Sequence, residues 1–458
     1  MGLRSRKMLS SAVVGASLLA FVMPIGAAAH APAQATAAAA SNGQPPREWI
    51  DPDTGHRIVR LSNEPGSLSL YFNYNAYTPQ GDKMVITTPK GIAAIDLKTF
   101  KETPVLDIAT PYRLLFTGHK TRNVYYETLP KDADGPKTVY AVDIDTGKQR
   151  KIATVPHGDI QTINADETLL GGVMTSPDAQ SQALNYFKKS DSRFGQANYQ
   201  AKGPDGKPLP YADAKEIRMN ERLEAKIPMT MFVVDTRTGQ QRPVYSSTDW
   251  LNHLQFSPTD PNLLMFCHEG PWQKVDRLWL LHLDQPDAKP VKIHQRTMNM
   301  EIAGHEWFSH DGKTIWYDLQ TPRGQDFWVA GYTIATGKRT WYHLLRNEWS
   351  VHYNLSPDQT MFSGDGGDPN MVAHAPDGKY LYLFTPHQVI PDAGIPSPNS
   401  ESLIEPGYFS AEKLVNMRKQ DYRLEPNGKF SPDGKWLIFR SNMFGPSYVF
   451  AVELAKAK

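Results

Sequence analysis

The sequence lacks the features that would tie it to a disulfide scaffold, a nucleic acid or a membrane. Cys267 is the only cysteine among 458 residues, so no intrachain disulfide can form and stability must come from packing. The 49 basic and 48 acidic residues give a net charge of +1, which argues against a nucleic-acid-binding surface. The apolar run from Ala12 to Met23 is shorter than the roughly 20 residues of a transmembrane helix.

The start of the chain has the pattern of an export signal. Three basic residues within the first seven positions precede the apolar run, and Ala27–Ala29 supplies the small residues of a cleavage site. We therefore expect a signal peptide over residues 1–29, a flexible leader over 30–41, and a mature chain that is periplasmic or secreted. No cysteine lies near the cleavage site, so we expect no lipid anchor. Removing three of the 49 basic residues leaves 46 against 48 acidic residues.

One phrase recurs along the rest of the chain. A polar turn, often Pro-Asp-Gly-Lys, is followed at once by a short hydrophobic strand, and most neighbouring copies lie about 40–50 residues apart, the period of a propeller blade. The turn is expected to deliver the chain into an inner strand, and blades must stack around an axis to bury both faces. We predict an all-β, seven-bladed β-propeller over residues 42–458. The copies begin near Tyr77, Phe116, Ile163, Phe256, Phe308, Leu355 and Phe430.

Two further patterns refine this prediction. Strands ending in Asp-x-x-Thr, as in YAVDIDTGKQR, are typical of the outer hairpin of a blade. The repeat is interrupted over residues 177–228 and 385–422, which we interpret as loop insertions over a face of the propeller, either functional lids or plain surface excursions. Helical patterns are present at 211–225 and 411–419 within these insertions.

Histidines gather beside three of the turn phrases. His253, His305 and His352 each stand a few residues before the phrase, and His268 follows a hydrophobic strand. Equivalent positions in successive blades converge at one end of the central channel, so we expect the three to share a site. Each has an alternative role as a hydrogen-bonded brace between blades.

The sequence resembles the oligogalacturonate lyases, a family of seven-bladed propellers. Residues 70–86 match less closely than the rest. The motifs that carry the resemblance are WLNH at 250–253, FCHEGPW at 266–272, GHEWF at 304–308 and SVHYNLSPDQTMFSGDGGD at 350–368.

The resemblance implies β-elimination on short uronate oligosaccharides, as in pectin degradation. In the family, a divalent cation, typically manganese, neutralises the substrate carboxylate while a histidine removes the C5 proton. His268 matches the base, His305 matches a metal ligand, and Arg277 matches an arginine that is a candidate for the substrate carboxylate. His253, His352 and Trp272 are candidates for lining the sugar pocket, with packing between blades as the alternative.

The sequence departs from the family at the remaining metal ligands. The family has Gln-x-x-His-Pro-His before the last turn phrase, whereas this chain has Glu425-Pro426-Asn427 at His-Pro-His and Tyr422 at the glutamine position, with Gln420 nearby. We expect His305, Glu425, Asn427 and Gln420 as candidate ligands for Mn²⁺, with Ca²⁺ or Mg²⁺ as alternatives. Alternatively the metal is lost, and an arginine such as Arg423 or Arg277 neutralises the carboxylate.

Two other functional classes remain open at this point. A non-catalytic periplasmic propeller that binds a saccharide or a protein would tolerate the altered ligands. A hydrolase would use Glu425 with a second carboxylate, although no second carboxylate is indicated by spacing.

Overall fold

Short antiparallel strands make up most of the regular structure. The computed structural model describes residues 44–130, 135–175, 204–207, 209, 211–285, 287–389 and 398–457, which belong to one compact unit, Ala38–Lys458. The predicted signal peptide and leader lie outside the described residues, as does most of the first predicted insertion.

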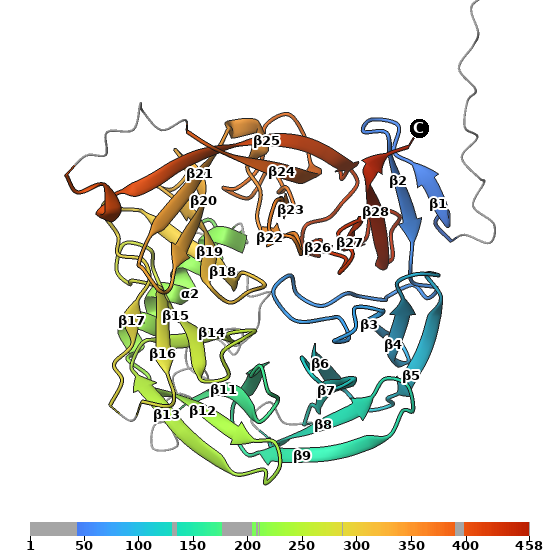
Figure 1. Cartoon of the computed structure of the whole chain (residues 1–458), viewed down its shortest axis with the longest axis horizontal. Coiled ribbons are helices and arrows are strands. Elements are labelled where there is room, and N and C mark those ends of the chain that lie inside the picture. Colours follow the sequence, from blue (N-terminus) through green and yellow to red (C-terminus); the bar gives the residue numbers. More distant parts are fainter. Residues whose placement is uncertain are drawn as a thin grey trace, which may run out of the picture. The chain divides into compact units, whose positions relative to one another are not determined.

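The strands follow one another as small sheets around a common centre (Figure 1). The first half of the chain contributes β1 (Glu48–Ile50), β2 (His56–Arg60), β3 (Lys83–Thr88), β4 (Gly91–Asp96), β5 (Glu102–Asp107), β6 (Tyr112–Thr117), β7 (Asn123–Thr128), β8 (Lys137–Asp143), β9 (Gln149–Val155), β10 (Asp159–Ile163), β11 (Leu169–Thr175), β12 (Met229–Asp235) and β13 (Gln241–Ser247). The second half contributes β14 (Trp250–Phe256), β15 (Leu263–Glu269), β16 (Leu278–His282), β17 (Val291–Lys292), β18 (Ile302–Phe308), β19 (Thr314–Gln320), β20 (Phe327–Thr333), β21 (Arg339–Leu344), β22 (Asn354–Leu355), β23 (Phe362–Gly364), β24 (Tyr380–Gln388), β25 (Ile404–Asn416), β26 (Lys429–Phe430), β27 (Trp436–Ser441) and β28 (Tyr448–Lys456).

Hydrogen bonding divides these strands into six sheets. Four of them are consecutive: β3–β5, β6–β9, β10–β13 and β14–β17. A fifth joins eight strands, β18 to β25, because β21 pairs in parallel with β25. The sixth combines β1 and β2 with β26 to β28, so strands from the two ends of the chain close the ring. The all-β prediction is confirmed, while the described sheets number six rather than seven.

The turn phrase occupies a different place from the one predicted. In six of its seven copies it joins an inner strand to the next strand, as where Phe430 ends β26 and Trp436 begins β27, while the copy at Tyr77 precedes β3. The inner strand therefore comes before the turn, and the polar turn residues lie at the end of that strand. Residues just ahead of the phrase, the three histidines among them, consequently lie along the inner strands.

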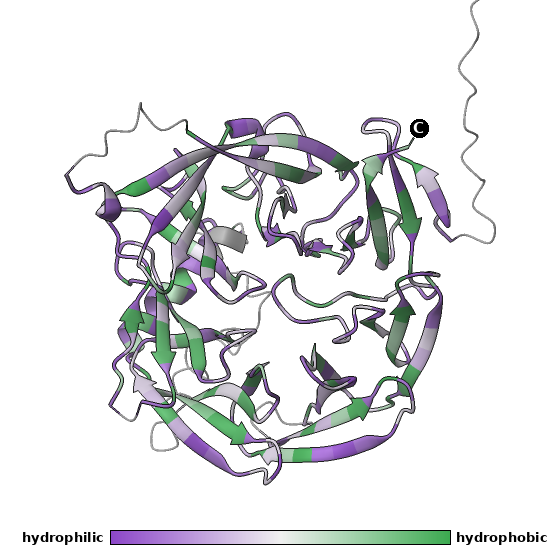
Figure 2. Cartoon of the chain, viewed as in Figure 1, coloured by the Kyte–Doolittle hydropathy of each residue, from purple (hydrophilic) through white to green (hydrophobic). Residues whose placement is uncertain are grey.

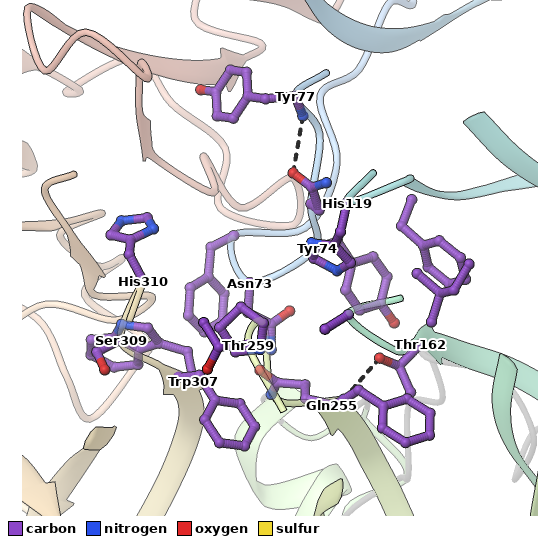
Figure 3. A pocket seen from close by; sticks show the side chains of 18 of the residues that line it. Asn73, Tyr74, Tyr77, His119, Thr162, Gln255, Thr259, Trp307, Ser309 and His310 are labelled. Carbon is purple, nitrogen blue, oxygen red and sulfur yellow. Dashed lines mark hydrogen bonds between the residues drawn. The ribbon is translucent and has the colours of Figure 1, made fainter. Parts of the chain in front are cut away.

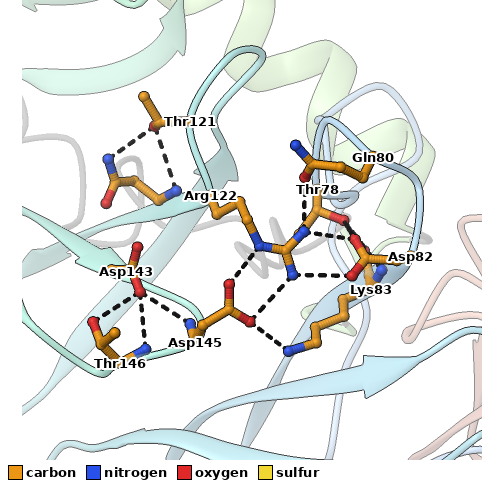
Figure 4. A network of polar contacts seen from close by, with 10 residues as sticks. Thr78, Gln80, Asp82, Lys83, Thr121, Arg122, Asp143, Asp145 and Thr146 are labelled. Atoms are coloured by element: carbon orange, nitrogen blue, oxygen red, sulfur yellow. Dashed lines mark hydrogen bonds and ion pairs between the residues drawn. The ribbon is translucent and has the colours of Figure 1, made fainter.

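The Asp-x-x-Thr hairpins form as predicted. Asp143 Oδ1 accepts hydrogen bonds from the backbone N–H and the hydroxyl of Thr146, both at 2.8 Å, and the same contacts recur at Asp96 and Asp235. Asp145, the residue before Thr146, pairs with Arg122, which also pairs with Asp82, the residue before β3 of the neighbouring sheet (Figure 4). The hairpin tips thus connect adjacent sheets.

The two predicted helices have opposite outcomes. The helix α2 (Tyr211–Ala225) forms as expected within the first insertion. The prediction of a helix over 411–419 is wrong, because residues 404–416 form β25, which pairs with β24 over residues 407–416. Phe409, Leu414 and Val415 of this strand are buried, and pairing against β24 outweighs local helix propensity. No described helix is long and apolar enough to cross a membrane.

The hydrophobic core is distributed between neighbouring sheets. One cluster joins Phe116 and Tyr125 of one sheet to Leu170 and Phe232 of the next, all at most 3% exposed. Figure 2 shows the same arrangement, with hydrophobic colour concentrated on strand segments of each sheet. Each large side chain buried in this way stabilises the fold by about 1.5–3 kcal/mol.

The connection between β2 and β3 extends to the centre of the ring (Figure 1). It carries Phe72, which is 1% exposed and packs against residues of the β18 and β22 region. This segment, which we call the central loop (residues 61–76), forms part of the walls of both sites described below.

Candidate active site

Four residues with an unusual backbone conformation mark one region of the inner strands. His253, His305, His352 and Asn427 have φ angles of 53°, 48°, 51° and 52°, in the left-handed region that non-glycine residues seldom adopt. Two of them lie in β-bulges, where the pairing register shifts between Asn252 and Gln255 and between Gly304 and Trp307. The predicted equivalence of the three histidines is therefore a shared left-handed backbone conformation, and strained backbone of this kind clusters at functional sites.

Aspartates on the second strands hold two of these rings. His305 Nδ1 lies 2.6 Å from Asp318 Oδ2, and His352 Nδ1 lies 3.0 Å from Asp365 Oδ2, each aspartate 13 residues after its histidine. A carboxylate accepts from Nδ1–H and leaves Nε2 as the unprotonated nitrogen. Sequence reasoning missed both aspartates, although their common spacing was a signal that could have found them.

The corresponding position of the third sheet holds Cys267. It pairs with Asn252, the residue before His253, just as Asp318 pairs with Gly304, the residue before His305. His253 instead contacts Glu306, with 3.0 Å between Nδ1 and Oε1, and its Nε2 lies 3.9 Å from Glu269 Oε2.

His253, Cys267 and Glu306 bring three possible metal-binding atoms within 4.8 Å of one another. Burial raises the pKa of the Cys267 thiol well above its usual range, so the thiol is protonated and is a weak ligand. The guanidinium of Arg277, itself buried, lies close enough to influence the charges of Glu269 and Glu306. We interpret this group as a buried cation–carboxylate network.

The pH dependence of stability tests this interpretation. Burial disfavours protonated His253, but the Glu306 and Glu269 carboxylates outweigh it and raise its pKa above the ordinary 6.5. A raised folded pKa contributes stability that is fully present below 6.5 and is lost as pH rises through the folded value. His253→Asn, which tolerates the left-handed backbone, should therefore cost about 1–3 kcal/mol at about pH 6 and less at about pH 9. Chemical denaturation at both pH values measures this, and an equal cost would contradict the assignment.

His268 is held ready to accept a proton. Its Nδ1 lies 2.8 Å from Asp249 Oδ2, and its buried Nε2 has no hydrogen-bond partner among the described residues. The hydrogen bond from His268 lowers the pKa of Asp249, so the carboxylate is ionised and fixes the proton on Nδ1. The ring also contacts Trp279, with 5.3 Å between centroids. Asp249 was not anticipated from the sequence.

His268 stands apart from the other histidines. Side chains alternate along β15, so His268 lies on the opposite face of its sheet from Cys267 and Glu269. The helix α2 connects the two faces, because Lys215 lies 3.3 Å from Glu269 and Lys226, just after the helix, lies 3.8 Å from Asp249. The helix α2 and Lys226 thus lie along this end of β14 and β15.

Glu425 joins His352 and His305. Its Oε2 lies 3.6 Å from His352 Nε2, an atom that is buried and has no described hydrogen-bond partner, and the two imidazole rings are 4.8 Å apart. Burial opposes ionisation of Glu425, but His352, His305 and Arg440 outweigh it and lower its pKa. An ionised carboxylate beside two imidazoles is a donor set that suits a divalent transition metal. We call His305, His352 and Glu425 the histidine site.

The structure gives two predicted metal ligands other partners. Asn427 Oδ1 accepts the backbone N–H of Phe72 at 3.1 Å, which ties it to the central loop. Gln420 Oε1 accepts from the Ser441 hydroxyl at 2.6 Å and from the Asn442 N–H at 3.2 Å. Their amide oxygens secure loops, so we correct the predicted ligand set by removing both.

Trp272 and Arg423, two further candidates from the sequence, have contacts that do not favour a role in substrate binding. The guanidinium of Arg323 lies 4.4 Å from the centre of the Trp272 ring and covers that face. Arg423 is highly exposed and pairs with Asp421, two residues away. Arg440, which the sequence analysis missed, contacts the backbone oxygen of Glu425 at 2.8 Å.

Comparison with known proteins identifies the family. A family description of oligogalacturonate lyases matches residues 200–457, a range that contains α2 and every residue of the histidine site. An oligogalacturonide lyase of Pectobacterium atrosepticum is 25% identical over 228 residues, and an oligogalacturonate lyase of Dickeya dadantii is 24% identical over 229. Each match covers 48% of this chain and 54% of the relative, so the chain spans about half the length of these curated relatives.

Two solved structures share the fold. An oligogalacturonate lyase in complex with manganese superposes with a TM-score of 0.67 at 19% identity, over 89% of this chain and 96% of the other. The enzyme from Vibrio parahaemolyticus gives a TM-score of 0.66 with the same identity and coverage. The family match over more than half of the residues, together with this likeness of fold, shows that the chain belongs to the oligogalacturonate lyase family.

Proposed function

We propose that this protein is a lyase that cleaves oligogalacturonate-like oligouronides by β-elimination. The observation that carries the proposal is His268, whose Nδ1 is fixed by Asp249 and whose Nε2 is without a described partner. In the reaction, Nε2 takes the C5 proton, the electron pair forms the C4–C5 double bond, and the C4–O bond breaks. The leaving oxygen is then protonated.

The position of the histidine site sets how the substrate would lie. His268 belongs to β15 and Glu425 to the segment before β26, so a bound oligouronide would lie across the ends of β14 and β15, between α2 and the histidine site. Lys215 faces this region, since it pairs with Glu269 and also lowers the pKa of Glu425. Its ammonium is placed to orient a substrate carboxylate.

The residues of the histidine site fit a divalent cation. His305, His352 and Glu425 would hold it, and the unpartnered Nε2 of His352 is the observation that favours this set. The manganese complex of a structural relative supports the same ion type. A bound cation supplies a Lewis acid that withdraws charge from the carboxylate next to C5. Asp318 and Asp365 keep the ligating imidazoles in orientation.

We also infer that the fold has seven blades. The eight-stranded sheet contains two four-stranded meanders, β18–β21 and β22–β25, joined only where Arg339–His343 pairs with Ile404–Tyr408. Residues 404–408 are the first part of the long strand β25, which extends from the second insertion. Counting the meanders separately gives seven units, as the repeats predict. Export of the chain is a further proposal from the sequence, which cell fractionation would test.

A panel of substrates tests the proposed activity. Incubation with oligogalacturonates should produce ultraviolet absorbance from the conjugated C4–C5 double bond, whereas neutral galactose oligomers should produce none. Binding of oligogalacturonates without absorbance would instead identify a non-catalytic binding protein. New reducing ends without absorbance would identify a hydrolase.

A further inference from the structure

A cavity lies beyond the histidine site, at the other end of the inner strands. It has a volume of about 700 Å³ and is lined by the residues at which β10, β14 and β18 end and the turn phrases begin (Figure 3). We call it the far cavity. Its wall includes Asn73, Tyr74, Thr162, Gln255, Trp307 and Lys429.

Phe72 separates this cavity from the histidine site. Its ring lies 5.2 Å from His352 and 6.5 Å from His305 on one side, and 6.0 Å from Trp307 on the other, measured between centroids. Phe72 also lines the far cavity and is 1% exposed. A molecule in the far cavity is therefore outside the space where the proposed elimination takes place.

Lys429 is a buried cation in the wall of the far cavity. It is 7% exposed, and its ammonium donates to the backbone oxygens of Tyr71 and Tyr74 in the central loop. No described carboxylate forms an ion pair with it. Burial alone lowers the pKa of Lys429 to about 7, as expected for an ammonium held without a counter-charge. A buried cation in this position is stabilised by an anion that enters the cavity.

Other groups in the wall suit a hydroxylated ligand. Trp307 is 4% exposed, and its Nε1–H has no hydrogen-bond partner among the described residues. The buried Oδ1 of Asn73 likewise accepts no hydrogen bond from a described residue. Gln255 and Asn75 add amide groups, and aromatic side chains complete the wall. Lys120 at the rim adds a second cation, while Asp166 is the one carboxylate among the described lining residues. The balance of charge favours an anionic ligand.

We propose that the far cavity is a binding site for a small hydroxylated carboxylate such as a uronic acid. The ligand's carboxylate pairs with Lys429, its hydroxyl groups bond to amides such as Gln255, and its ring packs on the aromatic wall. This site is separate from the histidine site and does not depend on the proposed lyase activity.

Calorimetric titration with galacturonate tests the site, since the monosaccharide has no glycosidic bond to cleave. We expect saturable binding to the intact protein, and affinity at least about tenfold weaker in Lys429→Met, which removes the charge at similar length. Thr259→Trp, a change at the exposed rim that leaves Lys429 in place, should also abolish binding, and it keeps the test valid if Lys429→Met does not fold.

Two comparisons separate the far cavity from the histidine site. His305→Ala should bind galacturonate as the unaltered protein does, and neutral galactose should bind at least about tenfold more weakly than galacturonate. The proposal is overturned if folded Lys429→Met binds normally, if galactose binds equally well, or if binding is lost in His305→Ala while Thr259→Trp retains it.

Discussion

Turnover should fall by about 10²–10⁴-fold when His268 is replaced by alanine, while the protein stays folded with the lower thermal stability expected from the loss of a buried, hydrogen-bonded ring. The imidazole is the proposed acceptor of the C5 proton, and alanine leaves no group to replace Nε2. Initial rates from the ultraviolet absorbance of the product, together with a thermal melt, measure both effects. Asp249→Asn should give an intermediate loss, because the amide no longer fixes the proton on Nδ1.

His282→Ala provides the matched control. His282 ends β16 in the same sheet and is partly exposed, so its removal should leave the rate unchanged. Near-full activity in His268→Ala would show that the base is another residue than His268. His305 would be the next candidate, since its ring is about one-third exposed and its Nδ1 is held by Asp318.

Removal of divalent cations should abolish most of the activity, and Mn²⁺ should restore it. The donor set of two imidazoles and one carboxylate is less oxygen-rich than the set expected from the sequence, because Asn427 and Gln420 are engaged elsewhere. Manganese therefore suits it better than Ca²⁺. Glu425→Gln should weaken Mn²⁺ binding by at least about tenfold, measured by calorimetry on the metal-free protein as well as by activity.

Glu401→Gln is the control for Glu425→Gln. Glu401 is an exposed acid in the second insertion, so this change should leave Mn²⁺ affinity unaltered. Full activity in metal-free protein that ignores chelators would show that no cation is needed. Lys215 or Arg440, whose charges lower the pKa of Glu425, would then have to neutralise the substrate carboxylate, and Arg423 is too exposed and too closely paired with Asp421 for that role.

The repeats in the sequence were sufficient to predict the class of fold and the shared position of three histidines. Turn residues and Asp-x-x-Thr hairpins act locally, so their structures follow from a few neighbouring residues. The histidines share one left-handed backbone conformation because each precedes the same turn in its own repeat. The helix expected at 411–419 failed for the opposite reason, since pairing with β24, a contact at long range, decided its structure.

The composition of the site was harder to predict because its partners come from different sheets. Glu425, which contacts His352, lies 73 positions after it in the chain. Phe72 of the central loop packs against both His305 and His352. Alignment to a motif can assign Asn427 a role, but it cannot show that its side chain is bonded to the Phe72 backbone. The spacing of 13 residues to Asp318 and Asp365 was readable from the sequence and was overlooked.

Elimination and hydrolysis differ in where the oxygen of the new chain end originates. Digestion of an oligogalacturonate in water labelled with heavy oxygen, followed by mass spectrometry, is the most direct test of the proposed chemistry at His268. We predict that each cleavage gives one fragment with a C4–C5 double bond, which is lighter by one water than its hydrolysis counterpart and takes up no solvent oxygen at C4, and that this fragment is absent with His268→Ala. Incorporation of one labelled oxygen at each cleavage with no fragment lighter by one water would contradict β-elimination.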